Sequence, residues 1–294
     1  MTAILAPGNQ SPRQNHLLAA LDTAVYERLL PDLELVPLPQ GKIIYEAGAK
    51  RGHVYFPTTG IISKHFVMED GASTVFAVVG NEGLLGVALF MGGETAPCRA
   101  VVQSAGYAYR LESSALKEEL RQGSRLQQLA LLYTQSLITQ MAQTAVCNRH
   151  HSLLAQVCRW LLQSLDRLPT NQLIMTQELI ANNLGVRRES VTAAATRLQQ
   201  TGLIEYCRGK ITVLDRGALE KQACECYVVM KNEFERLLMP EPKHTSHHRL
   251  QQTQGGRHAH PASITCSPSF PPAPPPHAAP ASSHHRAGAA VLRY

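Results

Sequence analysis

The apolar residues of this chain change their spacing near residue 113, and that change requires two kinds of secondary structure in succession. Between residues 33 and 112, short apolar runs alternate with glycine-bearing turns. The run 61–68, for example, is followed by Glu69-Asp70-Gly71, a hairpin signal. Short strands at this spacing predict a β-sandwich or a β-barrel.

The segment that follows, from Ser114 to Asp166, predicts long helices because it has almost no glycine or proline beyond Gly123. A long helix with a single apolar seam often pairs with its copy, so we expect a dimerisation helix over residues 115–150. Packing of the seam onto the chain's own barrel is the alternative. A second helix is predicted over 152–165. The seam residues recur at steps of three and four: Leu126, Ala130, Tyr133, Leu137, Met141 and Thr144.

The stretch from Leu173 to Leu214 predicts a helix-turn-helix followed by a hairpin. Thr176 is a good N-cap for a short helix over 177–184, and Gly185 follows where a left-handed residue is wanted. A second helix is expected over 188–200. Two short β runs then flank Arg208-Gly209, which predicts a wing with a basic tip.

This arrangement favours DNA as the partner. The first turn of the second helix of such a motif enters the major groove, where arginine pairs with guanine and glutamate accepts from cytosine. Residues 149–216 also carry nine lysines and arginines against five acids. A helical hairpin used only for packing is the alternative. The residues that we expect to contact DNA are Thr176, Arg187, Arg188, Glu189, Ser190, Thr192, Arg197, Arg208 and Lys210.

These motifs resemble those of the Crp/Fnr family of bacterial transcription regulators over residues 20–230. The resemblance rests on Leu-Gly-Val-Arg-Arg-Glu-Ser-Val at 184–191, Gly-Leu-Ile at 202–204 and Arg-Gly-Lys-Ile-Thr-Val-Leu-Asp at 208–215. Asn-Arg-His-His at 148–151 and Arg-Trp-Leu-Leu at 159–162 match one large branch. In that family the matching Arg188 and Glu189 contact bases. The family has a small capping residue where this chain has Arg187.

The resemblance implies an α+β fold: an N-terminal double-stranded β-helix or jelly-roll barrel, a long dimerisation helix and a C-terminal winged helix-turn-helix. The expected segments are a flexible N-terminus (1–20), a cyclic-nucleotide-binding-like sensor barrel (21–114), the dimerisation helix (115–150), the DNA-binding domain (151–240) and a tail (241–294). The implied function is regulation by a homodimer on a palindromic operator, with an unidentified effector at the barrel. RNA polymerase is a further candidate partner.

The effector pocket implied by the family does not favour cyclic AMP. The family's cyclic AMP binders hold the ribose with a glutamate and the phosphate with an arginine. Here Leu84 stands at the glutamate position and Cys98 at the arginine position. Losing both polar anchors should weaken binding, so cyclic AMP is not expected as the effector. The candidate pocket residues are Glu82, Gly83, Leu84, Leu85, Gly86, Cys98 and Arg99.

The cysteines predict neither a disulfide framework nor a metal site. Seven cysteines at scattered spacings indicate a reducing compartment, the cytoplasm. An iron–sulfur cluster of the family's kind needs cysteines near the N-terminus, whereas the first here is Cys98. Cys147, His150 and His151 have a spacing that suits a metal but supply only three local ligands. The Cys224-Glu225-Cys226 pair has no evident partner, so we expect no metal.

Other classes of protein are disfavoured. The chain has no apolar run of eighteen residues, no secretory signal and none of the common catalytic motifs, so neither a membrane protein nor an enzyme is expected. The tail from residue 241 is rich in proline and histidine and is predicted to be disordered. Two rival functions stay open: an effector-binding or interaction module without specific DNA readout, and a metal-handling protein that works through the histidine-rich tail.

Overall fold

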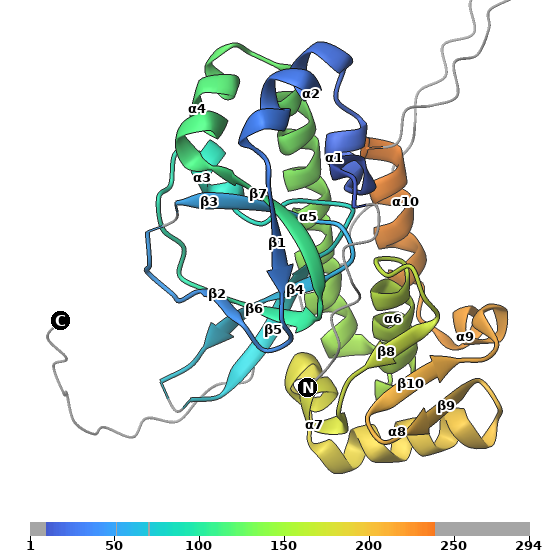
Figure 1. The fold of residues 1–294 in the computed structure, drawn as a ribbon. Coiled ribbons are helices and arrows are strands. Elements are labelled where there is room, and N and C mark those ends of the chain that lie inside the picture. Colours follow the sequence, from blue (N-terminus) through green and yellow to red (C-terminus); the bar gives the residue numbers. More distant parts are fainter. Residues whose placement is uncertain (1–9, 51, 70, 239–294) are drawn as a thin grey trace, which may run out of the picture. The chain divides into compact units, whose positions relative to one another are not determined.

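The N-terminal half of the chain forms a barrel from two antiparallel sheets that face each other (Figure 1). The computed structural model describes residues 10–50, 52–69 and 71–238. One sheet has the order β1-β7-β3 and the other β2-β6-β4-β5. The strands are β1 (Glu34–Leu38), β2 (Ile43–Tyr45), β3 (His53–Pro57), β4 (Ile61–Val67), β5 (Ser73–Val79), β6 (Arg99–Ser104) and β7 (Gly106–Glu112).

The core of the barrel lies between the two sheets. Leu38 and Ala108 come from the first sheet and meet Ile62, Val79 and Val102 from the second. The start of β7 approaches the turn before β4 so closely that Gly106 has no room for a side chain. A Cβ on Gly106 would lie only 2.4 Å from the backbone nitrogen of Gly60.

A second core covers the outer face of the β1-β7-β3 sheet and is built mainly from helices. Leu17 and Leu18 are buried in it, and the buried amide of Asn15 donates to the carbonyls of Pro57 and Gly83. Residues 10–20, expected to be flexible, are therefore held by the barrel. The elements that flank the barrel are η1 (Pro12–Gln14), α1 (His16–Ala19), α2 (Thr23–Leu29), η2 (Leu30–Asp32), α3 (Val87–Phe90), α4 (Ser113–Arg121) and α5 (Arg125–His150).

The segment 115–150, predicted as one dimerisation helix, contains two helices. Gly123, at a φ of 62°, separates α4 from the long helix α5. The first four residues of the predicted seam, Leu126, Ala130, Tyr133 and Leu137, are all buried within this chain. Leu126, Ala130 and Tyr133 belong to the core that the helices share with the barrel, so packing against the chain's own barrel is correct for this part of the seam. The apolar period marks a buried face but does not say what covers it.

The C-terminal part holds a three-stranded sheet of order β8-β10-β9 and a helical core of its own. Its last helix, α10, turns back and packs beside α5 (Figure 1). The elements are α6 (Leu153–Leu165), β8 (Gln172–Ile174), α7 (Gln177–Leu184), α8 (Arg188–Gln200), β9 (Ile204–Cys207), β10 (Lys210–Val213), α9 (Arg216–Gln222) and α10 (Cys226–Leu238).

The structure confirms the predicted fold class: a barrel, a long helix and a winged helix-turn-helix. The predicted tail, 241–294, lies outside the described residues, as do residues 1–9. Within the described part of the chain, no helix combines the length and the apolarity that crossing a membrane requires.

Candidate nucleic-acid interface

The two helices of the helix-turn-helix are joined as their sequence predicts. The Thr176 hydroxyl accepts from the amide of Leu179 and caps α7. Gly185 ends α7 in the left-handed conformation, at φ 67° and ψ 35°. The amide of Val186 then donates to the carbonyl of Ala181 and closes the turn. These local contacts fix the angle at which α8 leaves α7.

The second helix, α8, divides cleanly into a buried face and an exposed face. Val191, Ala194, Ala195 and Leu198 pack into the core. The opposite face, which includes Arg188, Glu189, Ser190, Thr192 and Arg197, is exposed. Arg187 is the N-cap but makes no side-chain capping bond, so the amides at this helix start lack a side-chain acceptor. Unpaired amides at a helix N-terminus attract a phosphate.

The wing lies next to the start of α8. Arg208 and Gly209 both have positive φ, 50° and 78°, as a two-residue hairpin turn of type I′ requires. The Tyr206 hydroxyl donates to the carbonyl of Met175 and ties the wing to the segment before α7. Burial raises the pKa of this phenol, while the charge of Arg188 acts to lower it, so the hydroxyl stays protonated at neutral pH.

The start of α7, the start of α8 and the tip of the wing enclose one open hollow of about 470 Å³. Of the predicted contacts, Thr176, Arg188 and Arg208 line it. Gln177, Glu178 and Tyr206 also line it and were not predicted, because their place on this surface depends on how α7 and the wing pack beside α8. Thr192 is less available for a DNA contact than expected, because its hydroxyl donates to Oε1 of Gln177 at 2.7 Å.

The basic side chains of this surface are not used in ion pairs by the residues that the structure describes. No acid among residues 10–50, 52–69 and 71–238 forms an ion pair with any of the five predicted cations. An exposed cation without an internal partner is free to neutralise a phosphate or to read a base. These cations are Arg187, Arg188, Arg197, Arg208 and Lys210.

The predicted effector residues lie in and beside the barrel, mostly without access to a ligand. Leu84 is buried in the helical core and Leu85 in the core between the sheets. Cys98 is buried, and Arg99 on β6 is paired with Glu46, Nε to Oε2, at 2.7 Å. Gly83 and Gly86 are buried on either side of the two leucines.

Glu82 belongs to a buried ion pair that links the barrel to the DNA-binding part. Its Oε1 lies 2.7 Å from Nε of Arg167, just after α6, and both side chains are 10% exposed. The other carboxylate oxygen accepts from the amide of Gly80. A Cβ on Gly80 would lie 2.7 Å from the Arg167 side chain, so this glycine makes room for the pair. Further from this pair, the Asn183 amide donates to the Gln103 side chain across the same boundary.

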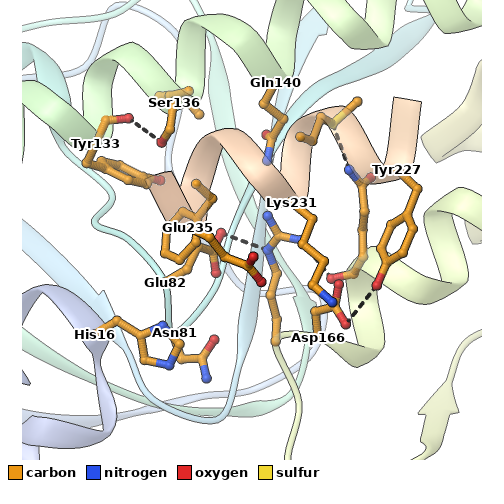
Figure 2. Close-up of a pocket in the computed structure, with 15 residues that line it drawn as sticks. His16, Asn81, Glu82, Tyr133, Ser136, Gln140, Asp166, Tyr227, Lys231 and Glu235 are labelled. Atoms are coloured by element: carbon orange, nitrogen blue, oxygen red, sulfur yellow. Dashed lines mark hydrogen bonds and ion pairs between the residues drawn. The ribbon is translucent and has the colours of Figure 1, made fainter. Parts of the chain in front are cut away.

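A cavity of about 240 Å³ lies beside this ion pair, between the barrel, α5, α6 and α10 (Figure 2). Its wall carries charges of both signs, including Lys231 and Glu235 from α10. Nδ1 of His16 and Oδ1 of Asn81 are buried without a hydrogen-bond partner in the described residues. The lining residues are His16, Asn81, Glu82, Tyr133, Ser136, Leu137, Gln140, Gln163, Asp166, Arg167, Tyr227, Met230, Lys231, Phe234 and Glu235.

Three cysteines and a histidine, for which no shared site was expected, lie close together in the folded chain. Cys224 and Cys226, thought to lack partners, meet Cys147 and His151, and the four ligand atoms lie within 4.8 Å of one another. The sequence could not show this because 77 residues separate Cys147 from Cys224. His150, part of the predicted local trio, is exposed and lies outside the group.

Comparison with known proteins gives the same two parts. A cyclic nucleotide-binding domain matches residues 35–123, and a Crp-like helix-turn-helix domain matches residues 155–222. The search of curated proteins found no match.

Solved structures share the fold at low sequence identity. FixK2 from Bradyrhizobium japonicum is 16% identical, with a TM-score of 0.56, and covers 65% of this chain and 98% of its own. A regulator assigned to the Crp/Fnr family from Eubacterium rectale is 22% identical, with a TM-score of 0.52, covering 70% and 96%. The c-di-GMP-responsive global regulator CLP of Xanthomonas campestris is 16% identical, with a TM-score of 0.51, covering 66% and 100%. With both family domains present in this order, the chain belongs to the Crp/Fnr family of transcription regulators.

Proposed function

We propose that this protein is a sequence-specific DNA-binding regulator that acts in the cytoplasm by binding and not by catalysis. The observation that carries the proposal is the exposed first turn of α8 together with five basic side chains that form no ion pair with the described part of the chain. Arg188 would read guanine and Glu189 cytosine in the major groove. Arg208 and Lys210 on the wing and Arg197 on α8 would contact phosphates.

The regulator would work as a homodimer on a palindromic operator. The seam predicted for pairing is largely covered by the chain's own core, but α5 carries a second apolar stripe. Leu131, Ile138 and Val146 on this stripe are 54%, 57% and 48% exposed. They recur at seven and eight residues, the spacing of a helix-pairing seam, and the exposed Ala142 and Ala145 lie between them. A two-fold axis along α5 would place two copies of α8 on one palindrome.

The effector of the barrel is proposed to be a molecule other than cyclic AMP. Leu84 and Cys98, at the positions of the two polar anchors, are buried and carry no charge. The relative CLP is described as responsive to c-di-GMP, so the fold does not by itself specify cyclic AMP. We place the effector in the 240 Å³ cavity, which shares Glu82 with the predicted pocket. A polar ligand there would compete for Arg167 and so shift the DNA-binding part relative to the barrel.

A selection of bound sequences from random duplex DNA tests the proposal. We expect an enriched palindrome, with binding that weakens steeply as salt rises. Arg188→Ala should relax the enrichment at one position of each half-site, whereas Lys42→Ala, which removes an exposed charge from the barrel, should keep the full pattern. Weak binding without sequence preference would support the interaction-module alternative instead.

A further inference from the structure

The end of α5 and the start of α10 bring together four side chains of the kind that bind zinc. Cys147 and His151 lie one helical turn apart at the end of α5. Cys224 and Cys226 lie in and just after the turn between α9 and α10. Their four ligand atoms, three sulfurs and one ring nitrogen, lie within 4.8 Å of one another. We propose that Cys147, His151, Cys224 and Cys226 bind a single zinc ion.

The distances suit a tetrahedral ion. Zinc bonds of about 2.3 Å to sulfur and about 2.0 Å to nitrogen hold the ligand atoms about 3.5–3.8 Å apart. The Sγ atoms of Cys147 and Cys224 are 3.4 Å apart, and Nδ1 of His151 is 3.4 Å from Sγ of Cys226. Small adjustments would therefore bring the four ligand atoms, which lie within 4.8 Å of one another, to the distances of a zinc site.

The histidine is already oriented for this role. Nε2 of His151 lies 3.1 Å from Oε1 of Glu225, so the N–H on Nε2 donates to that carboxylate. This arrangement leaves the lone pair of Nδ1 facing the three sulfurs. Histidines that bind metals are commonly held by a carboxylate on the other ring nitrogen in this way.

The surroundings are enclosed and positively charged. Cys147 and Cys226 are fully buried, and Met230 and Ala155 pack against the group. The Arg159 side chain, 4% exposed, has no ion-pair partner among the described residues, and its Nε has no hydrogen bond. Its charge acts on Cys147 and Cys224, opposing the rise in pKa that burial causes. Three thiolates around Zn²⁺ carry a net charge of −1 and would compensate this cation, whereas three neutral thiols do not.

The chemistry of the four ligands and the short distances between them favour a single zinc ion. Three thiolates and one imidazole are ligands for zinc and not for magnesium or calcium, which prefer oxygen. Ligand atoms this close surround one ion, because an iron–sulfur cluster places its own irons and sulfides between the cysteines. With four protein ligands the site is closed, as in structural zinc sites, and has no open position for a substrate.

The site would join parts of the chain that neither family domain contains. Cys147 and His151 lie between the two matched segments, and Cys224 and Cys226 lie after the second. His151 is the C-cap of α5, and α6 begins two residues later. Zinc would therefore fasten the α5–α6 junction to α10 and hold the DNA-binding part at a fixed angle to the long helix. Removing the ion should lower both the melting temperature and the affinity for DNA.

Metal analysis of the full-length chain, purified under reducing conditions, tests the proposal. We expect one zinc per protomer, reduced at least tenfold in Cys226→Ser and in His151→Asn. His150→Asn and Cys207→Ser are matched controls, since both residues are exposed and lie outside the group, and they should keep the zinc.

Cobalt substitution gives a second readout that does not depend on the variants folding. The tail carries eight histidines and one cysteine, Cys266, and a single thiolate gives weaker charge transfer than three, so the intense tetrahedral cobalt bands of three thiolates should come from the proposed site. Wild-type protein without these bands, or a zinc content unchanged in Cys226→Ser, would overturn the proposal. So would a Cys147–Cys224 disulfide in protein alkylated directly from cells, because it would assign the pair a redox role.

Discussion

Leaving Arg167 without its buried partner Glu82 should destabilise the fold strongly, and Glu82→Gln measures this cost. Glutamine keeps the shape of the side chain and an acceptor for the Gly80 amide, but it removes the negative charge. The Arg167 guanidinium then stays buried beside the Gln163 carbonyl without an opposite charge. Breaking a buried pair in this way costs about 3 kcal/mol of unfolding free energy, or somewhat more.

Urea unfolding followed by circular dichroism provides the measurement, and an exposed pair provides the control. Glu34 and Arg110 are 2.7 Å apart on the barrel surface, with side chains 59% and 34% exposed. Glu34→Gln should cost less than about 1 kcal/mol, because water screens that pair. In the double variant Glu82→Gln/Arg167→Met no buried charge is left, so its cost should be smaller than the sum of the single costs. Equal costs for the two glutamine variants, or additive costs in the double variant, would refute the reasoning.

Three further predictions concern the DNA surface, the effector and a buried histidine. Arg188→Ala should cost roughly 1–3 kcal/mol of operator binding and relax one position of each half-site, whereas Lys210→Ala should weaken all sequences equally; competition binding checks both. Calorimetry should find no low-micromolar binding of cyclic AMP. Such binding, together with an operator affinity that cyclic AMP increases, would contradict the prediction that the effector is another molecule. Burial and the charge of Arg99 lower the pKa of His65, so the unfolded chain binds more protons. The stability due to His65 is full above about pH 6.5 and is lost as the pH falls below it, so the wild type should lose more unfolding free energy on acidification than His65→Gln.

The parts of the fold that could be predicted from sequence are those decided by neighbouring residues. Thr176 caps a helix whose start it immediately precedes, and Gly185 supplies a left-handed turn at the next helix end. Gly209 favours the hairpin turn that Arg208-Gly209 forms between two short β runs. Because each of these signals acts within a few residues, the helix-turn-helix and its wing needed no knowledge of the rest of the chain.

The parts that sequence could not predict depend on contacts between distant segments. The seam containing Leu126 and Tyr133 was predicted as a face for pairing with a second copy, and only the folded chain shows that its own core covers it. The partner of Glu82 lies 85 residues away, and the cysteine group spans 77 residues. In both cases no residue nearby in the sequence indicates the contact. The residues meet only when distant segments of the chain pack together.

The central claim, that α8 reads base edges in the major groove, is tested most directly by probing guanine N7 on the selected operator with dimethyl sulfate. With the wild-type protein we expect two symmetric patches of protected guanines, about one helical turn apart. In Arg188→Ala, one guanine in each half-site should lose its protection while the remaining pattern persists. A protection pattern without two-fold symmetry, or one that Arg188→Ala leaves unchanged, would contradict the account.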